Sequence, residues 1–238
     1  MLRQTAMLVL TLVAAGGPLV AQAGRDDAAQ RARRQAMVDV IVRAGVRDTT
    51  TLGAMLRVPR HEFVPADVRD LAYGDHPLPI GHGQTISQPY IVAFMTEVLG
   101  ARPGLKVLEV GTGSGYQAAV LAAIGCDVYT MEIFEVLATE AAARLRLLGY
   151  DGVRVRHGDG HHGWPEAAPF DAVIVTAAAG YVPPKLLEQL KPGGRMVIPV
   201  GSVYGVQNLI LVEKDPRGRM TTRNLLPVRF VPMLEGLR

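Results

Sequence analysis

The sequence is short of several features that would assign it to common functional classes. It contains one cysteine, Cys126, so an intrachain disulfide and a cysteine-rich zinc site are both excluded. It has no long run of lysine and arginine, and the formal net charge is only +3 although the pI is about 9.2. Because nucleic-acid-binding proteins concentrate basic residues in patches, we expect no nucleic-acid partner.

Long apolar runs are also missing, apart from one near the start of the chain. Residues 7–20 are apolar but are interrupted by two glycines and a proline, and the run is too short for a comfortable membrane span. Arg3 precedes it and Ala21-Gln22-Ala23 follows it, which is the order of charge, apolar stretch and cleavage site in a signal peptide. Residues 1–23 are therefore expected to be a signal peptide, or else an extension produced by a misassigned start codon.

The most informative stretch, Lys106 to Tyr116, lacks one glycine that a dinucleotide site would have. An apolar strand-like run is followed by three glycines at positions 111, 113 and 115 and then by an alanine-rich helical segment. A G-x-G-x-x-G fingerprint needs glycine where Tyr116 stands, and Glu109 would repel a pyrophosphate but suits a cation. The spacing resembles the first motif of S-adenosylmethionine (SAM)-dependent methyltransferases. A tight turn without a ligand is the alternative.

The rest of the chain alternates between strand-like and helical patterns. Strands are expected at 107–110, 127–131, 153–156, 170–176, 195–200, 207–212 and 225–231, and helices at 25–44, 49–56, 90–99, 117–124, 133–148 and 183–190. Residues 58–65 are expected to be a loop, and residues 191–194 a turn. This order predicts a doubly wound, Rossmann-like α/β fold with a mostly parallel central sheet and helices on both faces.

The length and composition are those of one domain with a substantial core. The chain has 238 residues, of which 49% are hydrophobic and 20% charged. We expect a single domain over residues 24–238. Its helical part would cover about 25–100, and its α/β core about 101–238.

Acidic residues stand at the ends of two expected strands. Glu132 ends the second strand, where folds of this class hold a ribose by its hydroxyls. Asp159 follows the third strand and is placed to accept from an adenine amino group, although an ordinary turn aspartate is equally expected there. The neighbouring His161 and His162 point in different directions on either a strand or a helix, and no third ligand has recognisable spacing, so we expect no metal.

Residues 75–90 are rich in proline and glycine but carry few charges. We expect little regular structure there, and loops of this kind placed before a cofactor domain are candidates for substrate binding. An ordinary ordered connector is the alternative. In that case Ser87 would only cap the helix that follows, with Pro89 in its first turn.

Taken together, these segments resemble the protein-L-isoaspartate (D-aspartate) O-methyltransferase family. The resemblance covers roughly residues 46–236 in family order. The stretches that carry it are V-P-R-H-E-F-V-P (58–65), L-P-I-G-H-G-Q-T-I-S-Q-P (78–89), V-L-E-V-G-T-G-S-G-Y (107–116), H-G-D-G (157–160), A-P-F-D-A-V-I-V-T-A-A (168–178) and R-F-V-P (229–232). The glycine turn is shared by many methyltransferases, whereas G-Q-T-I-S-Q-P is much more specific.

The resemblance implies SAM-dependent methylation of the side carboxylate of L-isoaspartyl, and less well D-aspartyl, residues in age-damaged proteins. The ester then closes to a succinimide, which hydrolyses partly to normal aspartate. By position, Glu109, Gly111 and Gly113 would line the methionine part of SAM, Glu132 would take the ribose hydroxyls, and Asp159 with Gly160 would meet the adenine. Thr85, Ile86 and Ser87 would hold the substrate, with Ser87 on its carboxylate as the catalytic residue.

Several alternatives stay open at the level of sequence. The chain could methylate another peptide carboxylate, or could be an exported binding protein of the same fold without turnover. A nucleotide-dependent oxidoreductase is disfavoured by Tyr116. The resemblance implies a cytoplasmic monomer that needs neither membrane nor metal, whereas residues 1–23 indicate export.

Overall fold

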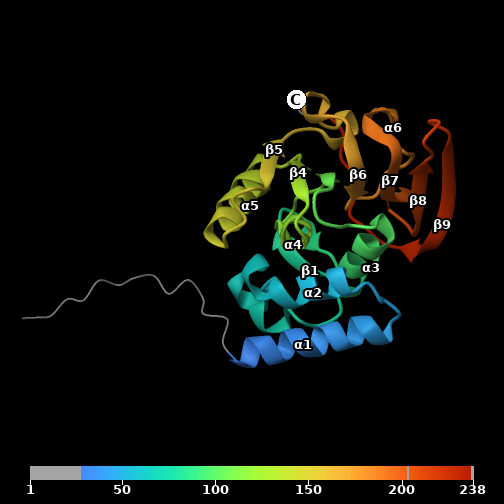
Figure 1. The fold of residues 1–238 in the computed structure, drawn as a ribbon. Helices are drawn as coiled ribbons and strands as arrows, with labels where there is room; N and C mark the ends of the chain where they lie inside the picture. Colours follow the sequence, from blue (N-terminus) through green and yellow to red (C-terminus); the bar gives the residue numbers. More distant parts are fainter. Residues whose placement is uncertain (1–27, 203, 237–238) are drawn as a thin grey trace, which may run out of the picture.

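The fold is organised around a seven-stranded sheet (Figure 1). The computed structural model describes residues 28–202 and 204–236, so the predicted signal segment 1–23 lies outside the described residues. The strands are β3 (Lys106–Val110), β4 (Asp127–Glu132), β5 (Arg154–His157), β6 (Phe170–Val175), β7 (Leu190–Gly201), β8 (Gln207–Lys214) and β9 (Met220–Val228). Their order in space is β5-β4-β3-β6-β7-β8-β9.

Strands β3 to β7 are parallel, and β8 is antiparallel to both of its neighbours. The apolar runs of β3 and β6 are buried on both faces, as central parallel strands require. The chain moves outward from β3 in one direction through β4 and β5, and in the other through β6 and β7. In open α/β sheets, ligands bind beyond the carboxyl ends of the strands at this reversal.

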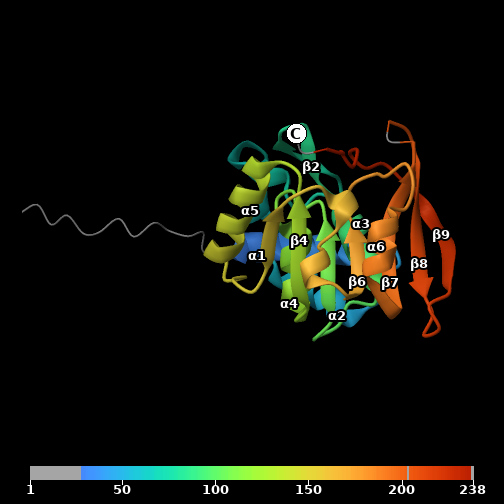
Figure 2. The ribbon, with the colours of Figure 1, turned by 90° about the horizontal axis from the view of Figure 1, so that it is seen from above.

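Helices cover the two faces unequally (Figure 2). One face carries α3 (Pro89–Leu99), α4 (Tyr116–Ile124) and the end of α5 (Glu135–Leu147) in one hydrophobic cluster. The other face carries the short α6 (Pro184–Gln189) and two single-turn 3₁₀ helices, η3 (Gly160–His162) and η4 (Pro165–Ala167). Neighbouring residues on β3 divide between the clusters, with Val107 in the first and Leu108 in the second, as the two-residue period of a strand requires.

The N-terminal helices extend the first cluster away from the sheet. Helices α1 (Ala28–Arg43) and α2 (Thr49–Arg57) pack on each other and on α3, and α2 also contacts α4. In Figure 1, α1 lies at the edge of the molecule farthest from the sheet. Within the described ranges, no helix combines the length and apolar character needed to cross a membrane.

The predicted elements occur in the predicted order, and the doubly wound class is confirmed. Three local predictions were wrong. Residues 75–90 contain a hairpin, β1 (Leu78–Gly81) and β2 (Gln84–Ile86), because His82 and Gly83 adopt left-handed φ values of 52° and 69° that reverse the chain. Residues 191–194 belong to β7 instead of a turn, and residues 60–63 form a 3₁₀ turn, η1, within the expected loop.

Candidate active site

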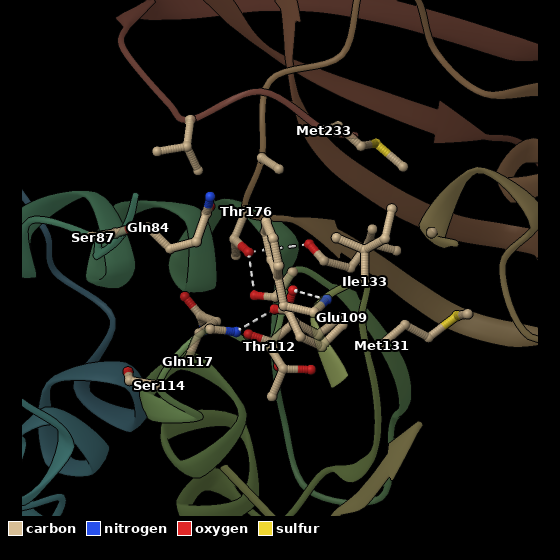
Figure 3. A pocket seen from close by; sticks show the side chains of 18 of the residues that line it. Gln84, Ser87, Glu109, Thr112, Ser114, Gln117, Met131, Ile133, Thr176 and Met233 are labelled. Carbon is tan, nitrogen blue, oxygen red and sulfur yellow. Dashed lines mark hydrogen bonds between the residues drawn. The ribbon is translucent and has the colours of Figure 1, made fainter. Parts of the chain in front are cut away.

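A cavity opens at the carboxyl edge of the sheet, where the strand order reverses. Its lining residues are 84–87, Val92, 109–114, 116–117, 131–134, 158, 160, 176–177 and 231–234. Figure 3 shows Gln84 and Ser87 on one side and Met131 and Ile133 on the other, with Glu109 and Thr176 between them. Its lining of apolar side chains with a few polar groups, at the reversal of strand order, is typical of a small-molecule or cofactor site.

The glycine turn after β3 forms the floor of this cavity and cannot accept a side chain at Gly111. Gly111 has φ 100°, and a Cβ placed on it would lie 2.4 Å from the hydroxyl oxygen of Thr176. That hydroxyl donates to the Gly111 carbonyl at 2.6 Å, which ties the turn to the end of β6. Glycine is therefore required both by the backbone angle and by the close approach of a neighbouring strand.

Four backbone N–H groups of the turn, those of residues 111, 112, 113 and 115, already have partners within the protein. Those of Gly111 and Thr112 donate to the Met131 carbonyl at 2.8 and 3.0 Å, and that of Gly113 donates to Glu132 Oε2 at 2.8 Å. A phosphate-binding loop instead directs free N–H groups at its ligand. The turn therefore lacks the donors of a pyrophosphate cradle, which argues against a dinucleotide-dependent oxidoreductase.

Glu109 provides a buried carboxyl group at the cavity. Its side chain is fully buried, and neither carboxylate oxygen has a hydrogen-bond partner among the described residues. Burial raises the pKa of Glu109 to about 8, with a smaller increase from the Glu132 charge and an opposing effect of the nearby Thr130 hydroxyl. A buried carboxylate without partners is costly unless a ligand supplies a cation, so this position fits a positively charged ligand.

Glu132 organises the same side of the cavity. Its Oε2 accepts from Gly113, and its Oε1 accepts from the Phe134 N–H at 3.1 Å. These bonds fix a carboxylate that is only 6% exposed at the cavity wall. Each carboxylate oxygen has a second lone pair, which leaves capacity to accept from ligand hydroxyls.

A second cavity lies against the first and shares four residues with it. It is lined mainly by Pro77, Ile91, Val206 and residues 227–231. The residues that line both cavities are Thr85, Ser87, Thr176 and Val231. We call β2 and the two residues after it, residues 84–88, the acceptor loop. This segment lies at the junction and contributes to the walls of both cavities.

The structure argues against the alternative in which Ser87 caps the following helix. The N-cap of α3 is Gln88, without a side-chain capping bond, and the Tyr90 N–H donates to Asp75 Oδ1 at 2.9 Å. Asp75 Oδ2 also accepts from Gln88 Nε2 at 2.9 Å. The Ser87 hydroxyl makes no hydrogen bond with the described residues and remains available at the cavity junction.

Asp159 has several partners from its own chain. Its Oδ1 accepts from the His161 N–H at 2.9 Å and lies 3.0 Å from His161 Nδ1, and its Oδ2 accepts from the Gly236 N–H at 2.9 Å. Burial alone would raise the pKa of Asp159, but these hydrogen bonds outweigh it and the pKa is lowered. The flanking Gly158 and Gly160 line the first cavity.

Comparison with known protein families is consistent with this geometry over nearly the whole chain. Residues 32–238 match the family model "Protein-L-isoaspartate(D-aspartate) O-methyltransferase (PCMT)". The chain belongs to this family. It is 55% identical, over 97% of its length and 96% of the relative, to protein-L-isoaspartate O-methyltransferase 2 of Syntrophobacter fumaroxidans. It is also 60% identical to protein-L-isoaspartate O-methyltransferase 1 of Nitrosospira multiformis, over 86% of this chain and 88% of that one.

Solved structures of protein-L-isoaspartate O-methyltransferases share the fold. One superimposes with a TM-score of 0.78 at 30% identity, and the match covers 85% of this chain and 66% of that chain. A putative enzyme from Plasmodium falciparum, solved in complex with S-adenosyl-L-homocysteine, gives a TM-score of 0.75 at 25% identity, covering 85% of this chain and 99% of that one. The SAM-dependent methyltransferase fold is therefore confirmed.

Most of the residues assigned by resemblance to this family line one cavity. Glu109, Gly111, Gly113, Glu132 and Gly160 line the first cavity together with Thr85, Ile86 and Ser87. The roles of the individual residues stay predictions, including that of Asp159. Among the described residues, no group of three or more histidine, cysteine, aspartate and glutamate side chains is placed to hold a metal ion.

Some residues that line this site were not predicted from the sequence to have a role in it. Thr176 ties the glycine turn to β6 and borders both cavities, and residues 231–234 close the first cavity from the C-terminal side. Thr176 follows a central strand, so its place at the carboxyl edge was inferable. Residues 231 and 232 belong to R-F-V-P (229–232), which carried the family resemblance but gave no signal of a cavity wall, and residues 233 and 234 carried no signal.

Proposed function

We propose that the protein transfers the methyl group of SAM to the side carboxylate of L-isoaspartyl, and less efficiently D-aspartyl, residues in damaged proteins and peptides. The observation that carries this proposal is the position of Ser87 on the wall shared by the first and second cavities. A hydroxyl donor at such a junction can hold a carboxylate of one ligand beside the reactive group of another. Membership of the family supports the choice of acceptor.

The first cavity, which we call the cofactor cavity, offers groups that suit the parts of SAM. When bound, SAM supplies a methyl group attached to a positively charged sulfur. Glu109 would hold the positive end of this ligand, Gly111 and Gly113 would let its methionine part approach the backbone, and Glu132 would accept from its ribose hydroxyls. Asp159 and Gly160 would meet the adenine.

The acceptor needs orientation more than activation. A carboxylate has a pKa near 4, so it is ionised and nucleophilic at neutral pH without a general base. Ser87 would donate to one oxygen of this carboxylate, and Thr85 and Ile86 would hold the adjoining peptide. Because anion and cation neutralise each other as the reaction proceeds, exclusion of water by the apolar walls favours transfer.

The decisive experiment compares two peptides of the same sequence, one with L-isoaspartate and one with normal aspartate. We expect methyl transfer from SAM to the isoaspartyl peptide and little or none to the aspartyl peptide. Equal transfer to both would indicate a different peptide carboxyl methyltransferase. SAM binding without transfer to either peptide would indicate a binding protein of the same fold.

Glu132→Ala is expected to weaken SAM binding by about 1–3 kcal/mol, because a charge-assisted acceptor for the ribose is lost. The substitution also leaves the Gly113 N–H without its carboxylate partner, so the melting temperature is measured alongside affinity. Glu135→Ala, at an exposed position of α5, is the matched control. Unchanged SAM affinity in a folded Glu132→Ala protein would refute the ribose role.

We propose a cytosolic location, because SAM is made in the cytosol and a methyltransferase needs a cofactor supply. N-terminal sequencing of protein from the native cell is expected to find no cleavage after Ala23. A mature chain that begins at Gly24 would instead demonstrate export through residues 1–23. We also propose that the protein acts as a monomer on damaged polypeptides, since both cavities are lined by one chain.

A further inference from the structure

Arg60 is the arginine that is completely buried among the residues the structure describes. Its side chain is 0% exposed, although it lies in a 3₁₀ turn (η1, Arg60–Phe63) between two prolines. Removing a guanidinium from water costs several kcal/mol, so its partners must compensate or its position must serve another purpose. Burial lowers the pKa of Arg60 to about 10, with opposing contributions from Tyr116 and Asp75, so the group stays cationic at neutral pH.

The partners of Arg60 come from three separate segments. Its Nε donates to the Ala72 carbonyl at 2.8 Å, and its Nη2 donates to the Ser87 carbonyl at 2.8 Å. Its guanidinium carbon lies 4.9 Å from the centroid of the Tyr116 ring, the first residue of α4. Tyr116 lines the cofactor cavity, and Ser87 lines both cavities.

We propose that Arg60 is a positioning residue for methyl transfer, which fixes the Ser87 carbonyl, and with it the acceptor loop, against the helix that borders the cofactor cavity. This inference rests on the proposed function. Asp75 holds the residues that follow Ser87, through its bonds to Gln88 and Tyr90. The C-terminal end of the acceptor loop is thus fixed by a buried cation at the Ser87 carbonyl and by a carboxylate at the next residues, so the Ser87 hydroxyl lies directly beside both attachments.

The planar fork of arginine is what allows this arrangement. Two nitrogens at a fixed separation donate to carbonyls of residues 72 and 87, while the guanidinium carbon lies over the Tyr116 ring. A lysine ammonium keeps the charge but concentrates its donors at one point, so it cannot reproduce both bonds with the same geometry. Arg60→Lys therefore changes the geometry of the bonds to the two carbonyls while largely preserving the positive charge.

We expect Arg60→Lys to lower kcat for an isoaspartyl peptide by about tenfold or more, because small displacements of reacting groups are costly. The affinity for S-adenosylhomocysteine, measured by calorimetry, is expected to stay within about threefold, since the cavity residues are intact. The affinity for the peptide, measured with S-adenosylhomocysteine bound, is expected to fall. The control is Arg57→Lys, whose exposed arginine donates to the Ala123 carbonyl at 2.7 Å and does not contact the acceptor loop.

A double-substitution cycle separates positioning from general stabilisation. If Arg60 acts through the acceptor loop, Arg60→Lys should reduce kcat by less than about threefold when Ser87 is already alanine. All assays are run well below the melting temperature of each variant. A purely structural Arg60 would lower the melting temperature while kcat per folded molecule stayed at the wild-type value, and that result would overturn the proposal.

Asp75→Asn provides a second test if Arg60→Lys does not fold. Asp75 is less buried than Arg60, and Asp75→Asn weakens the bonds to Gln88 and Tyr90. This variant should also retain S-adenosylhomocysteine binding and show a reduced kcat. Wild-type kcat in Asp75→Asn, or additive losses of Arg60→Lys and Ser87→Ala, would contradict the positioning role. A wild-type protein that does not methylate the isoaspartyl peptide would refute the proposed function itself.

Discussion

Ser87→Ala is expected to reduce methyl transfer to an isoaspartyl peptide by about 10- to 100-fold while SAM affinity is retained. A hydroxyl that donates to an anionic carboxylate contributes roughly 1.5–3 kcal/mol, and tenfold in rate corresponds to about 1.4 kcal/mol. Ser87 lies on the acceptor loop and not on the strands that form the cofactor cavity floor. Its loss should therefore affect the acceptor and leave the cofactor contacts intact.

The structure also predicts little change in the stability of Ser87→Ala. Helix α3 is capped through Asp75 and the Tyr90 N–H, so removing the Ser87 hydroxyl does not uncap it. SAM affinity, melting temperature and peptide methylation are measured on one preparation. Thr139→Ala, which removes an exposed hydroxyl on α5, serves as the control. Wild-type turnover per folded molecule would refute the role of Ser87. Loss of SAM binding would show that the acceptor loop contacts the cofactor and not the peptide substrate.

Glu109→Gln is expected to weaken SAM binding by about tenfold or more and to stabilise the protein without ligand at alkaline pH. The first effect follows because a buried carboxylate is replaced by a neutral group beside a cationic ligand. The second follows from the raised pKa of Glu109, about 8 in the folded protein against 4.5 for an ordinary glutamate. Between these values the folded state binds more protons than the unfolded state, so the free energy of unfolding falls as pH rises.

Two measurements check the Glu109 prediction. Thermal unfolding of the wild type should lose stability from about pH 5 to pH 8 relative to Glu109→Gln, with the largest difference above pH 8. At pH 7 the free wild type is mostly protonated at Glu109, so binding a cation there should release a proton. Calorimetry in buffers of different ionisation enthalpy detects this release. Equal proton release by wild type and Glu109→Gln would contradict the assignment, and Glu135→Gln is the control.

The features that the sequence predicted correctly depend on residues that are close together in the chain. The strand, glycine turn and helix around residues 106–124 follow from an apolar run and three glycines in consecutive order. Glu132 could be placed at the cavity because it ends a parallel strand beside β3, and the carboxyl ends of parallel strands share one edge. The assignment of Ser87 to an acceptor depended on family resemblance and was not available from periodicity.

The features that the sequence did not reveal depend on distant partners. Arg60 lies in an expected loop, where a charged side chain is normally solvated, but it is buried because carbonyls 12 and 27 residues away accept its donors. The hairpin at residues 78–86 depends on a non-glycine residue, His82, with positive φ, which propensity disfavours. Asp75 caps a helix that begins 14 residues later, at Pro89, so no local capping signal marks it.

The hydrogen bonds around Asp159 have a consequence for the ageing of the protein itself. Asp159 is followed by glycine, which offers little steric hindrance when a backbone nitrogen attacks the preceding side chain to begin isomerisation. The N–H groups of His161 and Gly236 immobilise its carboxylate and help to keep it ionised, and an ionised carboxylate is a poor electrophile. Asp151-Gly152, in contrast, lies on an exposed turn between α5 and β5. The contacts of Asp159 beside the cofactor cavity thus also protect an Asp-Gly sequence from the kind of damage that the enzyme is proposed to repair. We therefore expect isomerisation of this protein at Asp151-Gly152 before Asp159-Gly160.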